Sequence, residues 1–471
     1  MIASALPMRR GREVLGRLVT GALGASQYLR GATWEARAQY AAGCKLRIQA
    51  GGWDESQRAS YVLRQLHAAV RRAARETPFY ATRLRAAGFD PMRNFTFDDF
   101  AQLPPLERDE VAANTAGMLS PAVAPSRRRL DGTGGSTGAP LQYWSGPEER
   151  GWRLSGQDHY LARLGVARGA AVAYLWGHHI DRRERSHWRD RLRDAMTNQR
   201  FFDCFRLSPE VLLAYHRDMA AFGPSALVAY ASALAALAET LLDRGMHADY
   251  PSGCIITGAE KLWPAQRARI ESAFSAPVHE RYGSRDVGLI AGQYDGRAGA
   301  ALMVDWANLL IEPETTDRES AILVTKLHAD AMPMIRYRVG DMARFPEGSR
   351  PGWPVFRLEE VVGRQLDGLH LPDGRWVHGV GIPHLMKEQP LREFQVVQRA
   401  DYSVDVLVVP NERFTDATGA EIVRVLAGSL PGIPIRLQRV TAIARTEAGK
   451  WRPVITHVGR DATVATSKES S

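Results

Sequence analysis

The middle of the chain alternates between two hydrophobic periods. Short apolar runs at 171–176 (AVAYLW), 226–230 (ALVAY) and 253–258 (GCIITG) predict buried strands. The segment Ser208–Glu210 supplies a serine N-cap, a proline at the first helical position and an acidic first turn, so a helix is predicted there. Pro264 predicts the start of another helix. This alternation indicates an α/β domain with a largely parallel sheet, in which ligands bind at the carboxyl ends of the strands.

Upstream of this region, the apolar positions follow a helical period. Between Trp53 and Gly88 they recur near helical spacing, and the spacing ends at Thr77-Pro78. We therefore expect an outer helix that leads into a loop after this dipeptide.

The pattern changes again toward the C-terminus. Beyond Ser320 it becomes strand-like, and after Gly363 it predicts a strand, a helix near 420–430 and another strand. We expect two domains. The first, residues 1–362, contains mixed or parallel sheets and helices and begins with a helical extension at 1–55. The second, residues 363–471, is a small, mobile α+β domain.

Composition describes a packed globular protein. With 471 residues, 45% of them hydrophobic and 24% charged, the chain is neither disordered nor collagen-like, and its length suggests about two to four domains. The three cysteines lie far apart without a Cys-x-x-Cys pair, which excludes a disulfide framework and a zinc knuckle and favours a reducing cytoplasm. Polar residues interrupt the longest apolar stretch, 226–242, so no transmembrane segment is expected.

The net charge is +9, from 61 Lys+Arg against 52 Asp+Glu. Because the arginines are spread along the whole chain, we expect no nucleic-acid partner. The excess of positive charge would favour binding of an anionic ligand such as ATP or an acidic thioester donor.

A glycine-rich segment at 132–138 carries the first chemical signal. Its four glycines and three hydroxyl side chains suit a loop whose backbone N–H groups approach an oligophosphate. Ala139-Pro140 stands where a Walker A loop needs Lys-Ser/Thr, and Thr137 stands where a dinucleotide fingerprint needs glycine. A glycine-rich surface turn without a ligand remains an alternative.

The same segment also matches the G-x-S-x-G nucleophile elbow of hydrolases, with Ser136 as the nucleophile. That elbow follows an apolar strand and opens a helix. Here RRRL precedes the segment and the strand-like PLQYW follows it, which disfavours a serine hydrolase.

Further motifs follow downstream: YGSRD at 282–286, YRVGD at 337–341, GR at 363–364 and TEAGKWR at 446–452. In this order the set resembles the core motifs of the adenylate-forming superfamily of acyl-CoA ligases and carrier-loading adenylation domains. The flanks TPFY, LPPLERDEV, FFDCFRLSPE and ITGAEKLWPAQRARIESAF resemble the phenylacetate-CoA ligase-like branch, which includes CapK-type proteins. The resemblance extends from about Thr77 to Val454.

The resemblance implies roles for two charged residues. Lys450 matches the mobile lysine that touches the carboxylate and the α-phosphate during adenylation, and such a cation belongs where negative charge builds up. Asp286 matches the acidic residue, usually Glu, that holds Mg²⁺, and a shorter carboxylate still suits an ion bound mostly through phosphates and water. A solvated surface lysine and a surface acid are the respective alternatives.

Other positions match the nucleotide site. Asp341 corresponds to the ribose-binding carboxylate, although it could merely pair with Arg338 or Arg344. Arg364 corresponds to an arginine near the phosphates and the domain hinge. The whole ATP- or AMP-binding set implied is Thr133, Gly134, Gly135, Ser136, Thr137, Gly138, Gly258, Ala259, Glu260, Tyr282, Gly283, Ser284, Arg285, Asp341 and Arg364.

Two groups of residues are candidate walls of an acyl pocket, although structural roles are the more common ones for such residues. The first group, Trp176, His178 and His179, lies at the end of a predicted strand. The second, Phe201, Phe202 and Phe205, has near-helical spacing, which is more often a core pattern.

The sequence departs from the superfamily pattern at two positions. Arg285 replaces the customary threonine that contacts phosphate, and Leu366 stands where the hinge usually carries Asp or Lys. The zinc-site cysteines of some relatives are absent. These departures keep the nucleotide chemistry and bear on the hinge mechanics and the second half-reaction.

The resemblance implies an enzyme that uses ATP and Mg²⁺ to convert a small carboxylic acid to an acyl-adenylate and then transfers the acyl group, first of all to coenzyme A. A CapK-type enzyme with an amine or hydroxyl acceptor in polysaccharide or secondary-metabolite biosynthesis is one alternative. A scaffold that binds nucleotide without turnover is another. A cytoplasmic protein, with a homodimer as one possible assembly, is expected.

Overall fold

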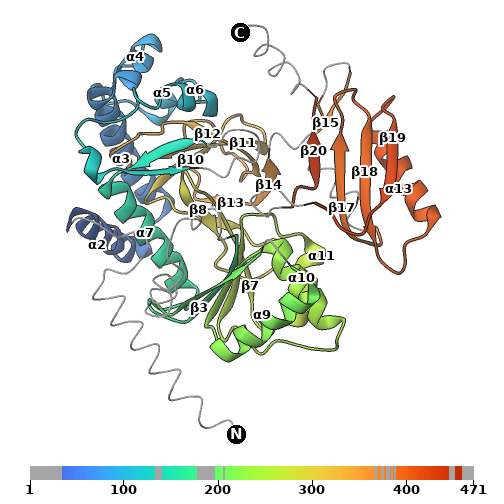
Figure 1. Cartoon of the computed structure of the whole chain (residues 1–471). Coiled ribbons are helices and arrows are strands. Elements are labelled where there is room, and N and C mark those ends of the chain that lie inside the picture. The colour runs from blue at the N-terminus through green and yellow to red at the C-terminus, as the bar shows by residue number, and fades with distance from the viewer. Residues whose placement is uncertain are drawn as a thin grey trace, which may run out of the picture. The chain divides into compact units, whose positions relative to one another are not determined.

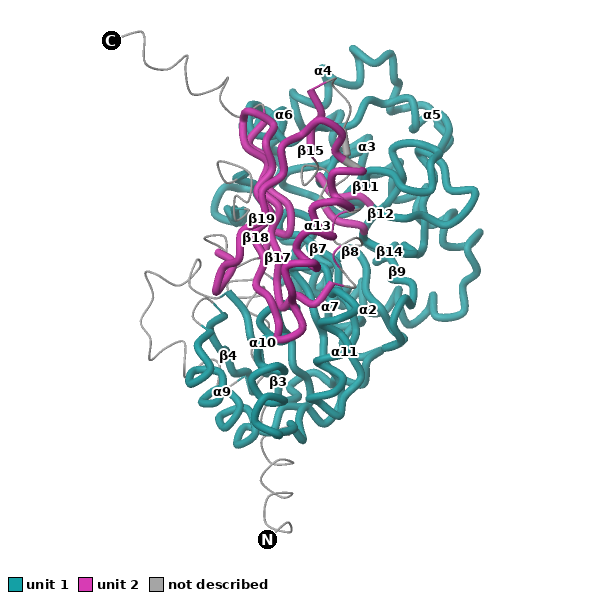
Figure 2. Tube along the Cα trace, turned by 90° about the vertical axis from the view of Figure 1, so that its right-hand side faces the viewer, with its two compact units in different colours: residues 1–339, 343–361 teal, residues 340–342, 362–471 magenta. Residues whose placement is uncertain are grey.

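The computed structural model describes residues 34–132, 141–177, 197–204, 207–364, 369–372, 376–377, 382, 386, 389–444 and 451–458 (Figure 1). They fall into two compact units, coloured separately in Figure 2. The first comprises residues up to 339 together with 343–361, and the second comprises 340–342 and the residues from 362 onward. The resemblance implies that residues 1–362 bind ATP and the acyl group and that residues 363–471 form a lid that carries Lys450. These roles stay predictions.

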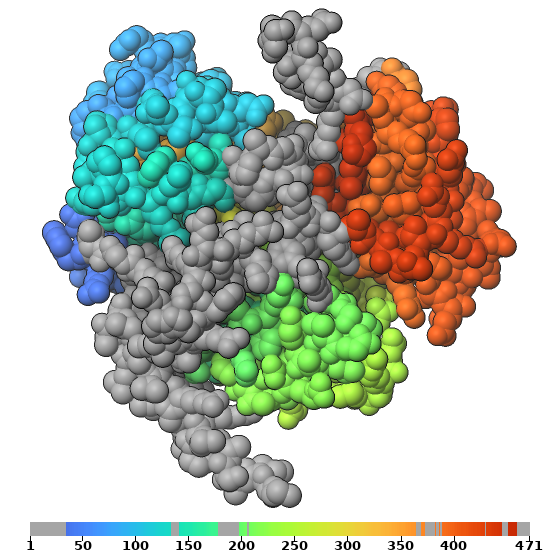
Figure 3. Space-filling model, in the orientation of Figure 1, coloured from blue at the N-terminus to red at the C-terminus, as the bar shows by residue number. Residues whose placement is uncertain are grey.

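The first unit begins with helices. Asp54 caps α3 by accepting a hydrogen bond from the backbone N–H of Gln57, whose side chain accepts from the backbone N–H of Asp54 in return. The predicted end at Thr77-Pro78 is confirmed, but Pro78 opens a further helix where a loop was expected, since proline is well tolerated at the first helical position. These helices are α2 (Trp34–Gln49), α3 (Glu55–Glu76), α4 (Pro78–Ala86), α5 (Phe97–Ala101) and α6 (Arg108–Ala113). In the space-filling view the light blue and cyan segment from α4 to α6 forms one continuous surface (Figure 3).

An eight-stranded sheet with the order β13-β9-β8-β7-β6-β5-β3-β4 forms the centre of the first unit. Its strands β4, β3, β5, β6 and β7 pair in parallel, as predicted. The antiparallel strands β8, β9 and β13 extend it. The bounds are β3 (Val172–Trp176), β4 (Gln199–Asp203), β5 (Ala226–Tyr230), β6 (Cys254–Gly258), β7 (Val278–Ser284), β8 (Gly288–Gly292), β9 (Leu302–Val304) and β13 (Arg357–Leu358).

Helices cover both faces of this sheet. On one face Leu175, Leu227 and Ile255 pack in a hydrophobic cluster with α9, α10 and α11. On the other face Tyr160 of α7 packs against Val228 and its neighbours. The helices are α7 (Pro147–Arg163), α9 (Pro209–Phe222), α10 (Ala231–Leu242) and α11 (Pro264–Ala273), the last of which begins at the predicted proline.

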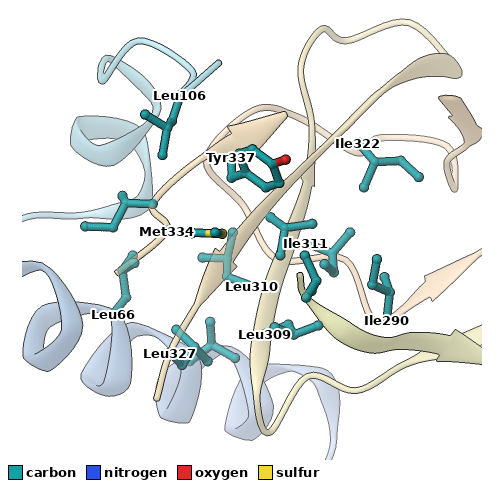
Figure 4. Packing of buried hydrophobic residues seen from close by; sticks show 14 of the residues in the cluster. Leu66, Leu106, Ile290, Leu309, Leu310, Ile311, Ile322, Leu327, Met334 and Tyr337 are labelled. Atoms are coloured by element: carbon teal, nitrogen blue, oxygen red, sulfur yellow. The ribbon is translucent and has the colours of Figure 1, made fainter. Parts of the chain in front are cut away.

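A smaller sheet, in the order β10-β11-β12-β14, contributes to the largest hydrophobic cluster. Leu66 of α3, Leu310 of β10, Ile322 of β11 and Met334 are fully buried in it (Figure 4). The bounds are β10 (Leu309–Pro313), β11 (Glu319–Lys326), β12 (Tyr337–Arg344) and β14 (Glu360–Arg364). A separate hairpin-like pair, β1 (Arg129–Gly132) and β2 (Gln142–Ser145), flanks the glycine-rich segment.

The second unit has a four-stranded sheet with the order β19-β18-β17-β20 and one described helix of regular length, α13. The predicted strand–helix–strand pattern is confirmed, because β18 and β19 pair in parallel and α13 connects them. The bounds are β15 (Leu369–His370), β16 (Trp376–Val377), β17 (Leu391–Gln398), β18 (Val404–Pro410), α13 (Asp416–Ser429), β19 (Ile435–Arg439) and β20 (Val454–Thr456).

Candidate functional site

Several of the predicted site residues lie outside the residues that the structure describes. These are Thr133, Gly134, Gly135, Ser136, Thr137, Gly138, His178, His179, Phe205 and Lys450. For Arg364 only the backbone, at the end of β14, is described. Leu366, the departure in the hinge, is also outside. Their roles stay predictions.

Aromatic side chains gather at the carboxyl ends of the parallel strands. Trp176 ends β3 and Tyr230 ends β5, and their rings meet edge to face with centroids 4.4 Å apart. The guanidinium of Arg281, on β7, lies over the indole ring of Trp176 at 5.7 Å. A Cβ atom on Gly258, which ends β6, would lie 3.5 Å from Cη2 of Trp176 and 3.2 Å from the carbonyl oxygen of Arg281. Four strands thus meet closely at the edge where an open α/β sheet binds its ligands.

The turn after β6 is fixed by its own side chains. Ala259 adopts a positive φ of 65°, which is uncommon for a residue with a Cβ atom. The carboxylate of Glu260 accepts a hydrogen bond from the backbone N–H of Ser232, at 2.9 Å, in the first turn of α10. Lys261 forms an ion pair of 2.5 Å with Glu360. The turn that carries the predicted nucleotide-binding residues Gly258, Ala259 and Glu260 is therefore anchored to the N-terminus of α10 and, through Lys261, to β14.

The segment after Tyr282 folds back tightly on itself. A Cβ atom on Gly283 would lie only 2.3 Å from the carbonyl oxygen of Gly288, so only glycine fits at this position. Ser284 Oγ accepts a hydrogen bond of 3.3 Å from the backbone N–H of Val287. The glycine and serine of the motif thus shape the turn that presents Arg285 and Asp286.

Asp286 is buried, with only 5% of its surface exposed. The hydroxyl of Tyr337, itself buried, donates a hydrogen bond to its carboxylate. Burial raises the pKa of Tyr337 above its ordinary value, and the nearby negative charge of Asp286 raises it further. Tyr337 therefore stays a neutral donor that orients the carboxylate.

The donor chemistry of Asp286 fits a magnesium ion that arrives with a polyphosphate. A carboxylate oxygen is a hard donor of the kind that Mg²⁺ prefers. Over the described part of the chain, no group of three or more His, Cys, Asp and Glu side chains comes together as a metal site. A single carboxylate suits an ion held mainly by phosphates and water.

Asp341 lies in β12 and is half-buried. Arg338 forms ion pairs with Glu107 and Glu314, and Arg344 pairs with Glu319 and Glu360. The two arginines considered as partners of Asp341 thus have glutamate partners. The ribose-binding role of Asp341 stays a prediction.

The two described phenylalanines of the candidate acyl pocket lie in a strand, although their spacing was near-helical. Phe201 and Phe202 belong to β4, where successive side chains point to opposite faces. Phe201 stacks on Tyr174, with centroids 4.6 Å apart and planes inclined by 10°. Phe202 is 5% exposed and packs in the hydrophobic cluster with Leu175. Core packing thus accounts for Phe202.

Sequence reasoning missed Tyr143 and Arg153 at this site, and it found Tyr337 only as part of a motif, without a role. The Tyr143 hydroxyl donates to the backbone carbonyl of Arg285 at 2.5 Å, and the Arg153 guanidinium donates to the same oxygen at 2.9 Å. The contacts join positions more than 100 residues apart, so no local pattern reveals them. The position of Tyr143 in the strand after the glycine-rich segment was the only available signal.

No helix of the described residues is both long and apolar enough to cross a membrane. This finding agrees with the expectation from the hydropathy pattern.

Comparisons with known proteins show which class of proteins shares this fold. No family model matches the chain. Crystal structures of a 2-hydroxyisobutyryl-CoA ligase match its fold. In the postadenylation state with 2-HIB-AMP the TM-score is 0.64, at 17% identity over 87% of this chain and 91% of the ligase. In the thioesterification state with 2-HIB-AMP and CoA it is 0.52, at 19% identity over 87% and 92%. The chain therefore has the fold of the adenylate-forming ligases.

The sequence is also similar to that of protein CapK from Staphylococcus aureus. The two are 22% identical over 383 residues, which cover 78% of this chain and 82% of CapK. The predicted resemblance to the adenylate-forming superfamily, and to its CapK-type branch, is confirmed.

Proposed function

We propose that this protein uses ATP to activate a carboxylic acid as an acyl-adenylate and then transfers the acyl group to an acceptor. The observation that carries the proposal is the agreement of two comparisons, a fold match to an adenylate-forming CoA ligase over 87% of the chain and a sequence match to CapK over 78%. The motif order of the sequence supports it.

The chemistry has two balanced steps. A carboxylate oxygen attacks the α-phosphorus of ATP, the bond between that phosphorus and the bridging oxygen breaks, and pyrophosphate leaves with the electron pair. A nucleophile of the acceptor then attacks the acyl carbon and loses its proton, and AMP leaves with the former carboxylate oxygen. Both steps concentrate negative charge, so positioned cations and N–H donors lower their barriers.

Each residue of the proposed site has a part in the first step. Lys450 supplies the cation between the carboxylate and the α-phosphate, and the N–H groups of the glycine-rich segment hold the phosphates. Asp286 would hold Mg²⁺, which neutralises the phosphates when it is bound. The carboxylate of Asp341 accepts hydrogen bonds from the ribose hydroxyls. Residues 258–260 and Tyr282 enclose the adenine. Trp176, at the end of β3, borders the acid.

Coenzyme A is the first candidate acceptor, because the fold match is a CoA ligase. A second candidate, which the resemblance of the sequence motifs to CapK-type proteins implies, is an amine or hydroxyl acceptor. After an active acid has been found, thioester formation with coenzyme A and ester or amide formation with a panel of amines and sugars separate the two.

Carboxylate-dependent exchange of labelled pyrophosphate into ATP tests the proposal. Over a panel of aryl and aliphatic acids, we expect at least one acid to support exchange. Lys450→Ala should abolish exchange but retain thioester formation from a preformed acyl-adenylate. Lys45→Ala, which changes an exposed lysine of α2, is the control. Equal loss of both half-reactions in Lys450→Ala would contradict the role of Lys450, and ATP binding without exchange for any acid would favour the scaffold.

A further inference from the structure

One backbone carbonyl in the candidate site accepts hydrogen bonds from two side chains. The oxygen of Arg285 accepts from the Tyr143 hydroxyl at 2.5 Å and from the Arg153 guanidinium at 2.9 Å. A carbonyl oxygen has two lone pairs, so its acceptor capacity is fully used. Because the peptide unit is planar, fixing this oxygen also fixes the N–H and Cα of Asp286.

The first donor belongs to the strand pair that flanks the glycine-rich segment. Tyr143 lies on β2 directly opposite Asp131 of β1, and its side chain is fully buried. Burial raises the pKa of Tyr143 above its ordinary value, and the nearby Asp131 and Asp286 carboxylates add to the increase. The hydroxyl therefore remains protonated and keeps donating at any physiological pH.

The side chain of Arg285 reaches the same strand pair. Its guanidinium lies 3.5 Å from the carbonyl oxygen of Gly132, the last residue of β1. Residue 285 is thus attached to β1 through its side chain and to β2 through its backbone. The resemblance to the superfamily implies a threonine that contacts phosphate at this position.

The second donor is itself held in place. Glu149 lies 3.4 Å from the guanidinium of Arg153 and 2.9 Å from Nζ of Lys326. The side chains of Glu149 and Lys326 are 2% and 3% exposed, so both charges are buried and their geometry is restricted. Arg153 therefore approaches the Arg285 carbonyl from a rigid ion-pair network on α7 and β11.

We propose that Tyr143, Arg153 and Arg285 form a latch that holds the Arg285–Asp286 peptide against the end of β1. Arg285 is then a positioning residue and not a phosphate ligand. The inference rests on the proposed function for its catalytic consequence. The latch itself is a property of the folded chain.

The first experiment removes one hydroxyl. Tyr143→Phe deletes the donor and keeps the buried ring, and Tyr160→Phe is the matched control. Tyr160 is equally buried, and its hydroxyl lies 3.5 Å from the carbonyl oxygen of Glu280, before the motif on the same strand. We expect Tyr143→Phe to accelerate amide hydrogen exchange in the peptide 282–288 while the control leaves it unchanged. This measurement needs no catalytic turnover. Equal amide hydrogen exchange of this peptide in both variants would overturn the proposed latch.

The second measurement is kinetic. With an acid that supports pyrophosphate exchange, Tyr143→Phe should lower kcat roughly ten-fold, the effect of a small misplacement of a reacting group, with an unchanged KM for the acid. Tyr160→Phe should change neither. An unchanged kcat in Tyr143→Phe would overturn the catalytic part of the proposal. Absence of pyrophosphate exchange in the unmodified protein would instead refute the proposed function. Amide hydrogen exchange would still show whether the latch exists.

The third measurement separates positioning from phosphate binding. We compare Arg285→Met with the double variant Tyr143→Phe/Arg285→Met, because residues that act through one peptide have non-additive effects. The latch predicts that the double variant is little slower than Arg285→Met alone, and that a non-hydrolysable ATP analogue binds Arg285→Met with unchanged affinity. Additive losses together with a weakened affinity for the analogue would make Arg285 a phosphate ligand.

Discussion

The carboxylate of Asp330 gives the stability of the first unit a defined pH dependence. It lies beneath the N-terminus of α7, where its two oxygens accept from the backbone N–H groups of Glu148 and Glu149 at 3.0 and 3.3 Å. The residue is 8% exposed. Burial raises the pKa of Asp330 to about 6 from an ordinary 3.8, and the neighbouring charges of Glu148 and Glu149 contribute to the rise.

The sign of the effect follows from proton binding. Between pH 3.8 and about 6 the folded state keeps a proton on Asp330 that the unfolded state has lost, so the free energy of unfolding falls as the pH rises. The stabilising contribution is complete below pH 3.8 and is lost above about pH 6. The gap between the two pKa values corresponds to about 3 kcal/mol, of which roughly 2 kcal/mol falls above pH 4.5.

Asp330→Asn removes the titration and keeps the shape of the side chain. We expect the free energy of unfolding of the variant, minus that of the unmodified protein, to increase by about 2 kcal/mol between pH 4.5 and 7. Equilibrium urea unfolding at several pH values, followed by tryptophan fluorescence, measures this difference. Asp243→Asn controls for the loss of an exposed carboxylate. A difference that is constant, or that decreases with pH, would refute the reasoning.

Two further substitutions test the buried framework of the site. Lys326→Met leaves Glu149 with only the more distant Arg153 as a charged partner. Because a buried charge that loses a hydrogen-bonded partner is costly, we expect a loss of about 2 kcal/mol in urea unfolding, and Lys326→Met/Glu149→Leu should recover most of it. A loss in the single variant of well under about 1 kcal/mol would contradict this account. Gly283→Ala places a Cβ atom against the Gly288 carbonyl oxygen and should lower pyrophosphate exchange at least about a hundred-fold, whereas Gly51→Ala meets no atom within 4 Å and should retain full activity. Similar activities of the two alanine variants would show that the turn tolerates a side chain.

Local signals predicted the parallel core of the fold well. The apolar runs at 171–176 and 253–258 became β3 and β6, and the Ser208 N-cap precedes α9 as expected. These features depend on side chains that are near in sequence, such as the Ser208 hydroxyl that accepts from the backbone N–H of Val211. Packing periodicity and caps are therefore visible in one sequence.

Features set by distant contacts were not predicted. The antiparallel strands β8 and β9, which extend the sheet, were not predicted. The spacing of the phenylalanines was near-helical, but β4 pairs with β3, and pairing with a neighbouring strand outweighs local spacing. Tyr143 and Arg285 are 142 positions apart, so their contact leaves no trace in either neighbourhood.

The sequence predicted which residues belong to the site better than it predicted how they are arranged. The motif at 282–286 was identified from its residues, yet the hydrogen bond from Tyr337 to Asp286 and the anchoring of Glu260 to α10 required coordinates. Both depend on which strand ends become neighbours. That arrangement is decided by the order of strands in the sheet.

The fate of one oxygen atom tests the central claim most directly. The acid that supports pyrophosphate exchange is prepared with ¹⁸O at both carboxylate oxygens and is converted completely in the presence of ATP and the acceptor. The released AMP is then analysed by mass spectrometry. Attack of the carboxylate on the α-phosphorus predicts one ¹⁸O atom in each AMP molecule. AMP without the label would show that water or another nucleophile attacks the phosphorus, and would contradict an acyl-adenylate intermediate.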